Sequence, residues 1–312
     1  MSTPLRPLST GELLDRTFHL YRNNFILFAG IAALAALTFV AALVILWALG
    51  FTFPTPGTDP RVFMREFSLY FGTIVLFYVL GASLAMGATI HAVSRVHLER
   101  LGSIGEAYRK VLPRVGRIIV IVLAIIVRMI GMLLLTYLAL IPVGIVLGLI
   151  LRAAGPETVL GRIFLMIFAA GIVIVVYGLI IRVYLKYSLA IQACLLEDMH
   201  VNDSLKRSAF LAQGSLWRIF LIHLLMWMMV LGLSFVLHWP GRLIFSHTSM
   251  AALVYDFLAT FVAYTIAFPI AGIAIALLYY DQRVRKEALD LQLMMEAVSG
   301  APQASATVAP TA

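Results

Sequence analysis

Three ionisable residues lie inside long apolar segments of this chain, where a charged group could hold a ligand: Arg128, His223 and Asp256. A charge within a membrane span is costly, and it usually faces the interior of a helix bundle or water. We therefore predict that Arg128 is a counter-ion for an anionic headgroup or solute, with Asp256 or His223 as partner. Two alternatives stay open, because Arg128 could reach the cytoplasmic interface with its long side chain and His223 could hydrogen-bond locally.

No motif for metal binding or catalysis accompanies these residues. The sequence contains no His-Glu-x-x-His spacing, no Gly-x-Ser-x-Gly turn and no P-loop, and its single cysteine, Cys194, excludes a cysteine cage. We expect no catalytic residue, no metal, no cofactor and no enzyme activity. An intramembrane enzyme is the remotest alternative, since no pair of nucleophile and base can be named.

The composition determines the class of protein that has to position these side chains. Of 312 residues, 62% are hydrophobic and 12% are charged, whereas soluble domains are about half apolar and a quarter charged. The chain is therefore expected to be an integral membrane protein, and the even spread of its apolar segments indicates one domain. The net charge of +8 fits the preference for positive charge on the cytoplasmic side, so no nucleic-acid partner is expected.

Six segments are long enough to cross a hydrocarbon core of about 30 Å, which predicts an all-α fold. We place a polytopic membrane domain at 1–298, with spans at about 25–51, 69–93, 118–148, 163–181, 217–238 and 252–280. The apolar stretch 118–151 would be about 50 Å long as a helix, so we expect Pro142 to kink the span or to mark the point where it leaves the bilayer. Residues 53–68 contain three prolines and predict a loop. A cytoplasmic helix at 281–298 and a disordered tail at 299–312 complete the chain.

The segment 103–119 predicts a helix that lies flat on the membrane surface. Ser103 and Glu106 have the spacing of a capping box, in which each side chain bonds the other residue's backbone N–H. The apolar residues after them form one stripe, and the basic residues lie mostly off it. Pro113 predicts a kink or a break that turns the chain from the surface into the bilayer.

The same register recurs at Ser9 and Glu12, and a weaker copy has Asp203 in place of the glutamate. The interfacial helices are expected at about 10–22, 104–116 and 203–214. Such recurrence is typical of internal repeats. We therefore predict three repeats, each an amphipathic interfacial helix followed by a transmembrane hairpin. The alternative is that basic amphipathic linkers simply occur in any polytopic protein.

Most Lys and Arg residues fall in the N-terminal segment, the two long loops and the C-terminal helix. The positive-inside rule therefore predicts that both termini and all three interfacial helices are cytoplasmic. We expect the basic residues there to form a collar that binds anionic lipid headgroups of the cytoplasmic leaflet. The predicted collar comprises Arg109, Lys110, Arg114, Arg117, Lys206, Arg207, Arg218, Arg283, Arg285 and Lys286.

The segments 5–25, 103–110, 195–220 and 277–293 together resemble a bacterial membrane domain that precedes a glycerophosphoryl diester phosphodiesterase in some proteins. The resemblance implies a six-span helical domain in the bacterial inner membrane that is often encoded alone. It implies no catalysis, because the phosphodiesterase activity belongs to a soluble barrel of about 250 further residues. Arg128, and Gln192 where a proline is expected, depart from the pattern.

The leading functional prediction is a non-catalytic inner-membrane protein that binds or organises lipids or envelope partners through its basic collar. Anionic lipids and a second membrane protein are the expected partners. The main alternative is a transporter or channel for a small anionic or amphipathic solute, because repeats and proline-containing spans also occur in transporters. Substitution of Arg128 by leucine would separate these two functions.

Overall fold

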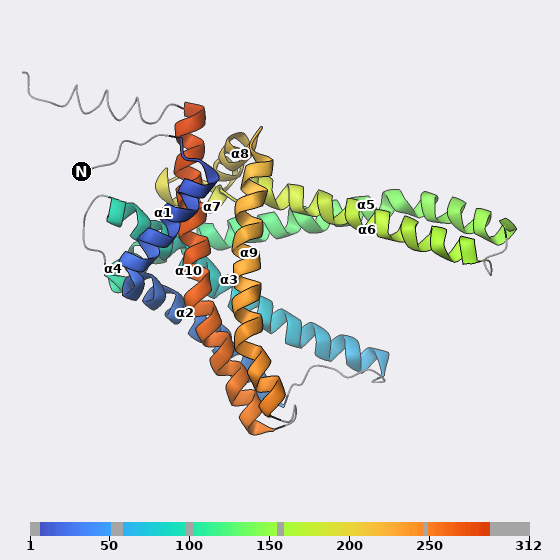
Figure 1. Cartoon of the computed structure of the whole chain (residues 1–312), viewed down its shortest axis with the longest axis horizontal. Helices are drawn as coiled ribbons and strands as arrows, with labels where there is room; N and C mark the ends of the chain where they lie inside the picture. Colours follow the sequence, from blue (N-terminus) through green and yellow to red (C-terminus); the bar gives the residue numbers. More distant parts are fainter. Residues whose placement is uncertain (1–6, 51–58, 98–102, 155–158, 246–248, 288–312) are drawn as a thin grey trace, which may run out of the picture.

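The structure is a computed structural model that describes residues 7–50, 59–97, 103–154, 159–245 and 249–287 (Figure 1). Its elements are α1 (Thr10–Asn23), α2 (Phe25–Ala48), α3 (Pro60–His97), α4 (Ile104–Val111), the 3₁₀ turn η1 (Leu112–Arg114), α5 (Val115–Ala154), α6 (Val159–Tyr187), α7 (Ala190–Leu196), α8 (Val201–Ala212), α9 (Leu216–Ile244) and α10 (Met250–Glu287). Helices α2, α3, α5, α6, α9 and α10 are long and apolar enough to cross a membrane. The prediction of an all-α membrane protein with six spans is confirmed.

Pro60 has a different effect from the one predicted, and Pro142 lies inside a long helix. Residues 60–68 belong to α3 and not to a loop, because Pro60 occupies the first helical position and the Asp59 carboxylate accepts a hydrogen bond from the Arg61 N–H at 2.8 Å. At Pro142, where we predict a kink or the exit of the span from the bilayer, α5 continues as one helix. Membrane helices tolerate proline when neighbouring groups and local adjustment satisfy the freed backbone.

The predicted capping box is complete at the start of α1, but only half of it forms at the start of α4. At α1 the capping box is complete, with the Ser9 N–H bonded to Glu12 at 2.7 Å and the Glu12 N–H to Ser9 at 3.2 Å. At α4 the Ser103 hydroxyl accepts from the Glu106 N–H, but the Glu106 carboxylate instead pairs with Arg95 at 2.8 Å. The interruption predicted at Pro113 is present as the 3₁₀ turn between α4 and α5.

Helix α10 is the centre of the packing. It lies against α9, α2, α3 and α1, and in its second half nearly every residue from Pro269 to Tyr279 is buried. Its apolar side chains meet Phe28 and Ile31 of α2 and Ile90 of α3 in one core cluster. The predicted C-terminal helix is not separate, because α10 runs on without a break to Glu287. Its remainder and the predicted tail lie outside the described residues.

Helices α2 and α3 approach each other closely at a small residue. A Cβ atom added at Gly81 would overlap the Thr38 hydroxyl and lie 3.0 Å from the Ala35 carbonyl oxygen. Even a methyl side chain at this crossing would therefore require Thr38 or the helices to shift, as expected where small residues allow close helix approach.

Helices α5 and α6 form a hairpin that leaves the rest of the bundle (Figure 1). Its base is anchored by a second core cluster that contains Ile121 and Ile125 of α5, Ala190 and Cys194 of α7 and Leu205 of α8. Further out, the large apolar side chains of both helices are exposed, Leu134 and Ile174 among them. The hairpin therefore diverges from α9 and α10 and leaves a wedge between α6 and α9.

Candidate functional site

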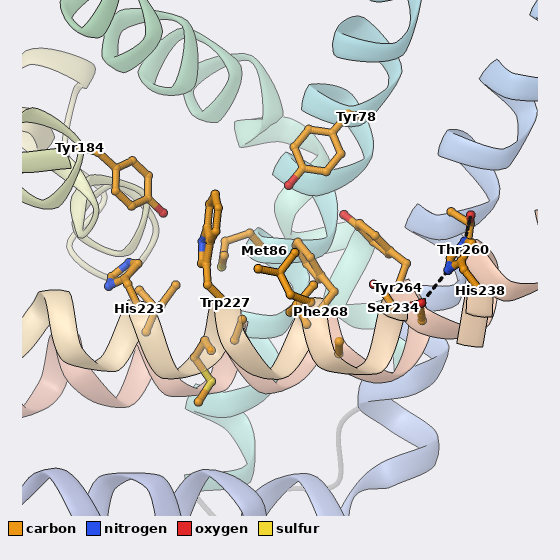
Figure 2. A pocket seen from close by; sticks show the side chains of 17 residues that line it. Tyr78, Met86, Tyr184, His223, Trp227, Ser234, His238, Thr260, Tyr264 and Phe268 are labelled. Atoms are coloured by element: carbon orange, nitrogen blue, oxygen red, sulfur yellow. Dashed lines mark hydrogen bonds between the residues drawn. The ribbon is translucent and has the colours of Figure 1, made fainter. Parts of the chain in front are cut away.

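A cavity of about 390 Å³ lies in this wedge, between α3, α6, α9 and α10. Figure 2 shows its aromatic and polar side chains converging from these helices. The lining residues are Tyr78, Met86, Tyr184, His223, Met226, Trp227, Val230, Leu231, Ser234, His238, Thr260, Ala263, Tyr264, Ala267, Phe268, Ala271 and Ile275. The α10 part of the lining alternates alanines with the aromatic residues Tyr264 and Phe268, whereas the α9 part includes Met226, Trp227 and Leu231.

The cavity follows α9 for about 22 Å from His223 to His238, at the rise of an α-helix. Between these two histidines the α9 wall consists of apolar side chains such as Met226 and Val230, with Ser234 near the second histidine. On this α9 wall the polar groups therefore lie towards the two ends. The site therefore has the character of an apolar slot with a polar group at either end.

At one end of the cavity, the imidazole of His238 has partners for both ring nitrogens. Its Nδ1 lies 2.8 Å from the Ser234 carbonyl oxygen, and its Nε2 lies 3.2 Å from the Thr260 hydroxyl. A backbone carbonyl can only accept, so Nδ1 carries the hydrogen and the neutral ring accepts from Thr260 at Nε2. This end of the cavity is satisfied within the protein.

At the other end, the imidazole of His223 has a partner for one nitrogen. Its Nδ1 lies 2.8 Å from the Ile219 carbonyl oxygen, and the residue is 6% exposed. Its Nε2 is buried and has no hydrogen-bond partner among the described residues. The Tyr184 ring stands edge-on to the imidazole, with 5.5 Å between the ring centres. A polar atom without a partner therefore lies at this end of the slot.

Two further tyrosines contribute hydroxyl groups to the middle of the cavity. Tyr78 of α3 and Tyr264 of α10 meet edge to face with ring centres 6.4 Å apart, and Tyr264 stacks on Phe268 at 4.8 Å. Figure 2 shows the Tyr78 and Tyr264 hydroxyls on facing sides of the same space. Aromatic faces and hydroxyls together suit an amphipathic guest.

The three intramembrane residues predicted as a site do not come together. Arg128 donates to the Ala124 carbonyl at 2.9 Å, and its guanidinium lies 5.3 Å from the centre of the Tyr187 ring. It is exposed and does not line the cavity, and the structure gives no contact between it and Asp256 or His223. Of the three residues, only His223 lines the cavity.

Much of the predicted collar is bound within the protein. The Glu197 carboxylate accepts from Tyr279 and pairs with Arg207 at 3.0 Å and Arg283 at 3.4 Å, and Glu287 pairs with both arginines. Burial alone would lower the pKa of Arg207, but hydrogen bonds to Glu287 and Glu197 raise it above its ordinary value. These charges stabilise the contact of α8 with α10 and are not available to lipid.

A second group of charges ties the N-terminal segment to the bundle. The Asp281 side chain is fully buried and accepts from the Leu8 N–H at 2.7 Å, from Arg218 at 3.0 Å and from Arg285 at 2.9 Å. Both arginines also donate to the Leu8 carbonyl oxygen. The Asp281 group, namely Leu8, Arg218, Asp281 and Arg285, therefore joins α9, α10 and the start of the chain.

The rest of the collar divides into paired and exposed residues. Arg114 and Arg117 both pair with Asp198, at 3.2 and 3.1 Å. Lys286 donates to the Phe210 carbonyl, and exposed Lys206 lies 3.8 Å from Asp203. Arg109 and Lys110 of α4 are exposed, and no ion pair is found for them in the described part of the chain. Within the predicted collar, the exposed basic residues without an ion pair in the described part of the chain therefore lie on α4.

No family model, curated protein or solved structure matches this chain. The resemblance to the phosphodiesterase membrane domain, and the internal repeats, therefore stay predictions. Only the fold and the cavity bear on the function of the protein.

Sequence reasoning missed most of the cavity. His238 carries the same signal as His223, a polar residue inside an apolar helix, and could have been singled out with it. Tyr78, Tyr184 and Tyr264 could not, because aromatic residues are common throughout the spans. Their convergence depends on how α3, α6 and α10 pack around α9.

Proposed function

We propose that this membrane protein binds a lipid or another amphipathic molecule of the bilayer in the cavity between α3, α6, α9 and α10, without catalysing a reaction. The observation that supports this function is an apolar slot with polar ends, built from helices that are long and apolar enough to span a membrane. Its volume of about 390 Å³ lies within the range of about 300–1,000 Å³ that is usual for ligand sites.

The position of the cavity supports entry from the bilayer. It lies where α6 diverges from α9, and the rim residues Trp227 and Leu231 are 64% and 61% exposed on the apolar surface. An apolar molecule could pass this rim without crossing water, which would be unfavourable. Lateral entry therefore fits a lipid better than it fits a polar solute.

The chemistry of the lining supports binding without catalysis. The described residues that line the cavity include no carboxylate, lysine, arginine or cysteine. Ser234 is bonded to His238 through its carbonyl oxygen and not its hydroxyl, so the two do not form a pair of nucleophile and base. Because the described lining offers no such pair and no charged or thiol group, we propose a binding role.

Location and orientation belong to the same proposal. We place the protein in the inner membrane of a bacterium with both termini in the cytoplasm, on the distribution of Lys and Arg. Arg109 and Lys110 on α4 would then face the anionic leaflet, where each basic residue contributes about 1 kcal/mol to lipid attraction. We propose that Arg109 and Lys110 hold α4 at the membrane surface and do not select the ligand.

A transporter that uses Arg128 has less support. Arg128 lies outside the cavity, against Tyr187 on α6, and no acidic residue in the described part of the chain pairs with it. A translocated anion would need a positive group within its pathway.

Native mass spectrometry of the protein released from its own membrane tests the proposed function. The wild-type protein is expected to retain one lipid or lipid-like molecule. Leu231→Trp places a large side chain at the rim of the cavity and should remove that adduct. Leu243→Trp is the matched control, because Leu243 lies on the same helix, is 71% exposed and does not line the cavity. Equal adducts in all three proteins, or none in the wild type, would refute the proposal.

A further inference from the structure

The two cavity histidines share one backbone arrangement, which allows a direct comparison. Each lies on α9 and bonds through Nδ1 to the carbonyl oxygen four residues earlier, His223 to Ile219 and His238 to Ser234, both at 2.8 Å. Because a carbonyl cannot donate, the hydrogen lies on Nδ1 in both rings. In the neutral form each Nε2 is therefore a hydrogen-bond acceptor.

The partner of that acceptor differs between the two rings. At His238 the hydroxyl of Thr260 lies 3.2 Å from Nε2 and supplies the hydrogen. At His223 no described residue supplies one, although the residue is only 6% exposed. A buried acceptor without a donor is costly, and native structures rarely keep one without a reason.

We infer that the ligand carries a neutral hydroxyl group and donates its hydrogen to Nε2 of His223, in the way that Thr260 donates to His238. This inference rests on the proposed function, because it names the chemical class of the guest in the same cavity. It makes the ligand a lipid alcohol, with its hydroxyl at His223 and its apolar chain along α9 towards His238.

The charges of the cavity favour an alcohol over an ion. An anionic group has only lone pairs to present to Nε2, and no Lys or Arg is among the described lining residues. Arg218, the nearest basic residue before His223 on α9, is already bonded to Asp281 and the Leu8 carbonyl. A cationic group could donate to Nε2, but it would lack a carboxylate partner in an apolar site. A neutral donor has neither penalty.

The shape of the slot fits a chain that starts at His223. Beyond the imidazole, Met226 and Trp227 line the next turn and Leu231 the turn after that. The Tyr184 ring borders the His223 end and contacts the imidazole edge-on, so the hydroxyl would approach Nε2 beside this pair of rings (Figure 2). The ligand would bury its polar end and cover the alanine face of α10 with its chain.

A competition between two matched probes tests the inference. The full-length protein in detergent is mixed with equal amounts of hexadecan-1-ol and 1-methoxyhexadecane, and the two adducts are counted by native mass spectrometry. The ether has the same chain and an oxygen atom but no hydrogen to donate. The alcohol is expected to be retained about tenfold more than the ether, as one buried hydrogen bond would give.

Variants of the two histidines assign the preference to one ring. His223→Leu should bring the ratio of alcohol to ether near one, and His223→Gln, whose amide oxygen can accept, should keep part of the preference. His238→Leu is the matched control and should leave the ratio near tenfold, because its acceptor is already bonded to Thr260.

The outcomes separate this inference from the proposed function. Equal retention of alcohol and ether by the wild type would overturn the inference and leave the proposed function standing. Failure to retain either probe would overturn both. A preference seen only in Tyr184→Phe would mean that the Tyr184 hydroxyl fills the acceptor itself, and it would also overturn the inference.

Discussion

Asp281→Asn is expected to loosen the attachment of the N-terminal segment to the bundle. The Asp281 side chain is fully buried and is bonded to the Leu8 N–H, Arg218 and Arg285. Removal of one partner of a buried ion pair costs about 3–5 kcal/mol. The side chains of Arg218 and Arg285 are 20% and 34% exposed, and both keep their bonds to the Leu8 carbonyl. We therefore lower the expected loss in the free energy of unfolding to about 2–3 kcal/mol.

The assay is unfolding by dodecyl sulfate in mixed micelles, followed by circular dichroism. Asp203→Asn is the matched control, because Asp203 is exposed and lies 3.8 Å from an exposed lysine; surface pairs of this kind contribute at most about 1 kcal/mol. If Asp281→Asn lowers the free energy of unfolding no more than the control does, that result refutes the reasoning, because the buried Asp281 group would then not stabilise the protein more than a surface ion pair.

Two further substitutions test the packing. Gly81→Ala should destabilise the protein by about 1–3 kcal/mol, because its Cβ would meet α2, whereas Gly72→Ala, with no atom within 4 Å of the added Cβ, should be neutral or slightly stabilising; equal effects in the same unfolding assay would contradict the close approach of the two helices. Arg128→Leu should change stability by at most about 1 kcal/mol, the size of its contact with Tyr187, and should leave the retained lipid unchanged; loss of that lipid would return Arg128 to the binding site.

The sequence was sufficient for the features that depend on local patterns. Apolar runs predicted the six long helices, and the spacing of Ser9 and Glu12 predicted a capping box that is present. The local signal failed at Pro60, because proline can also begin a helix, as it does here after the Asp59 cap.

The candidate site was less predictable because it depends on tertiary contacts. His223 could be singled out from its place in an apolar helix, but its unfilled acceptor is visible only beside the pairing of His238 with Thr260. The collar was overestimated for a similar reason. Glu287 lies far from Arg207 in the sequence, and their contact exists only after α8 packs on α10.

The central place of α10 determines the order in which the protein can be assembled. Helices α1, α2, α3 and α9 all precede it in the chain, and all of them pack against it. Because synthesis proceeds from the N-terminus, these helices enter the membrane before their common partner has been made. Until α10 arrives, the surfaces of Phe28 and Ile90 that pack on it lack this partner. The bundle therefore closes late in biogenesis, and a chain that stops before Met250 would lack the helix on which α1, α2, α3 and α9 all pack.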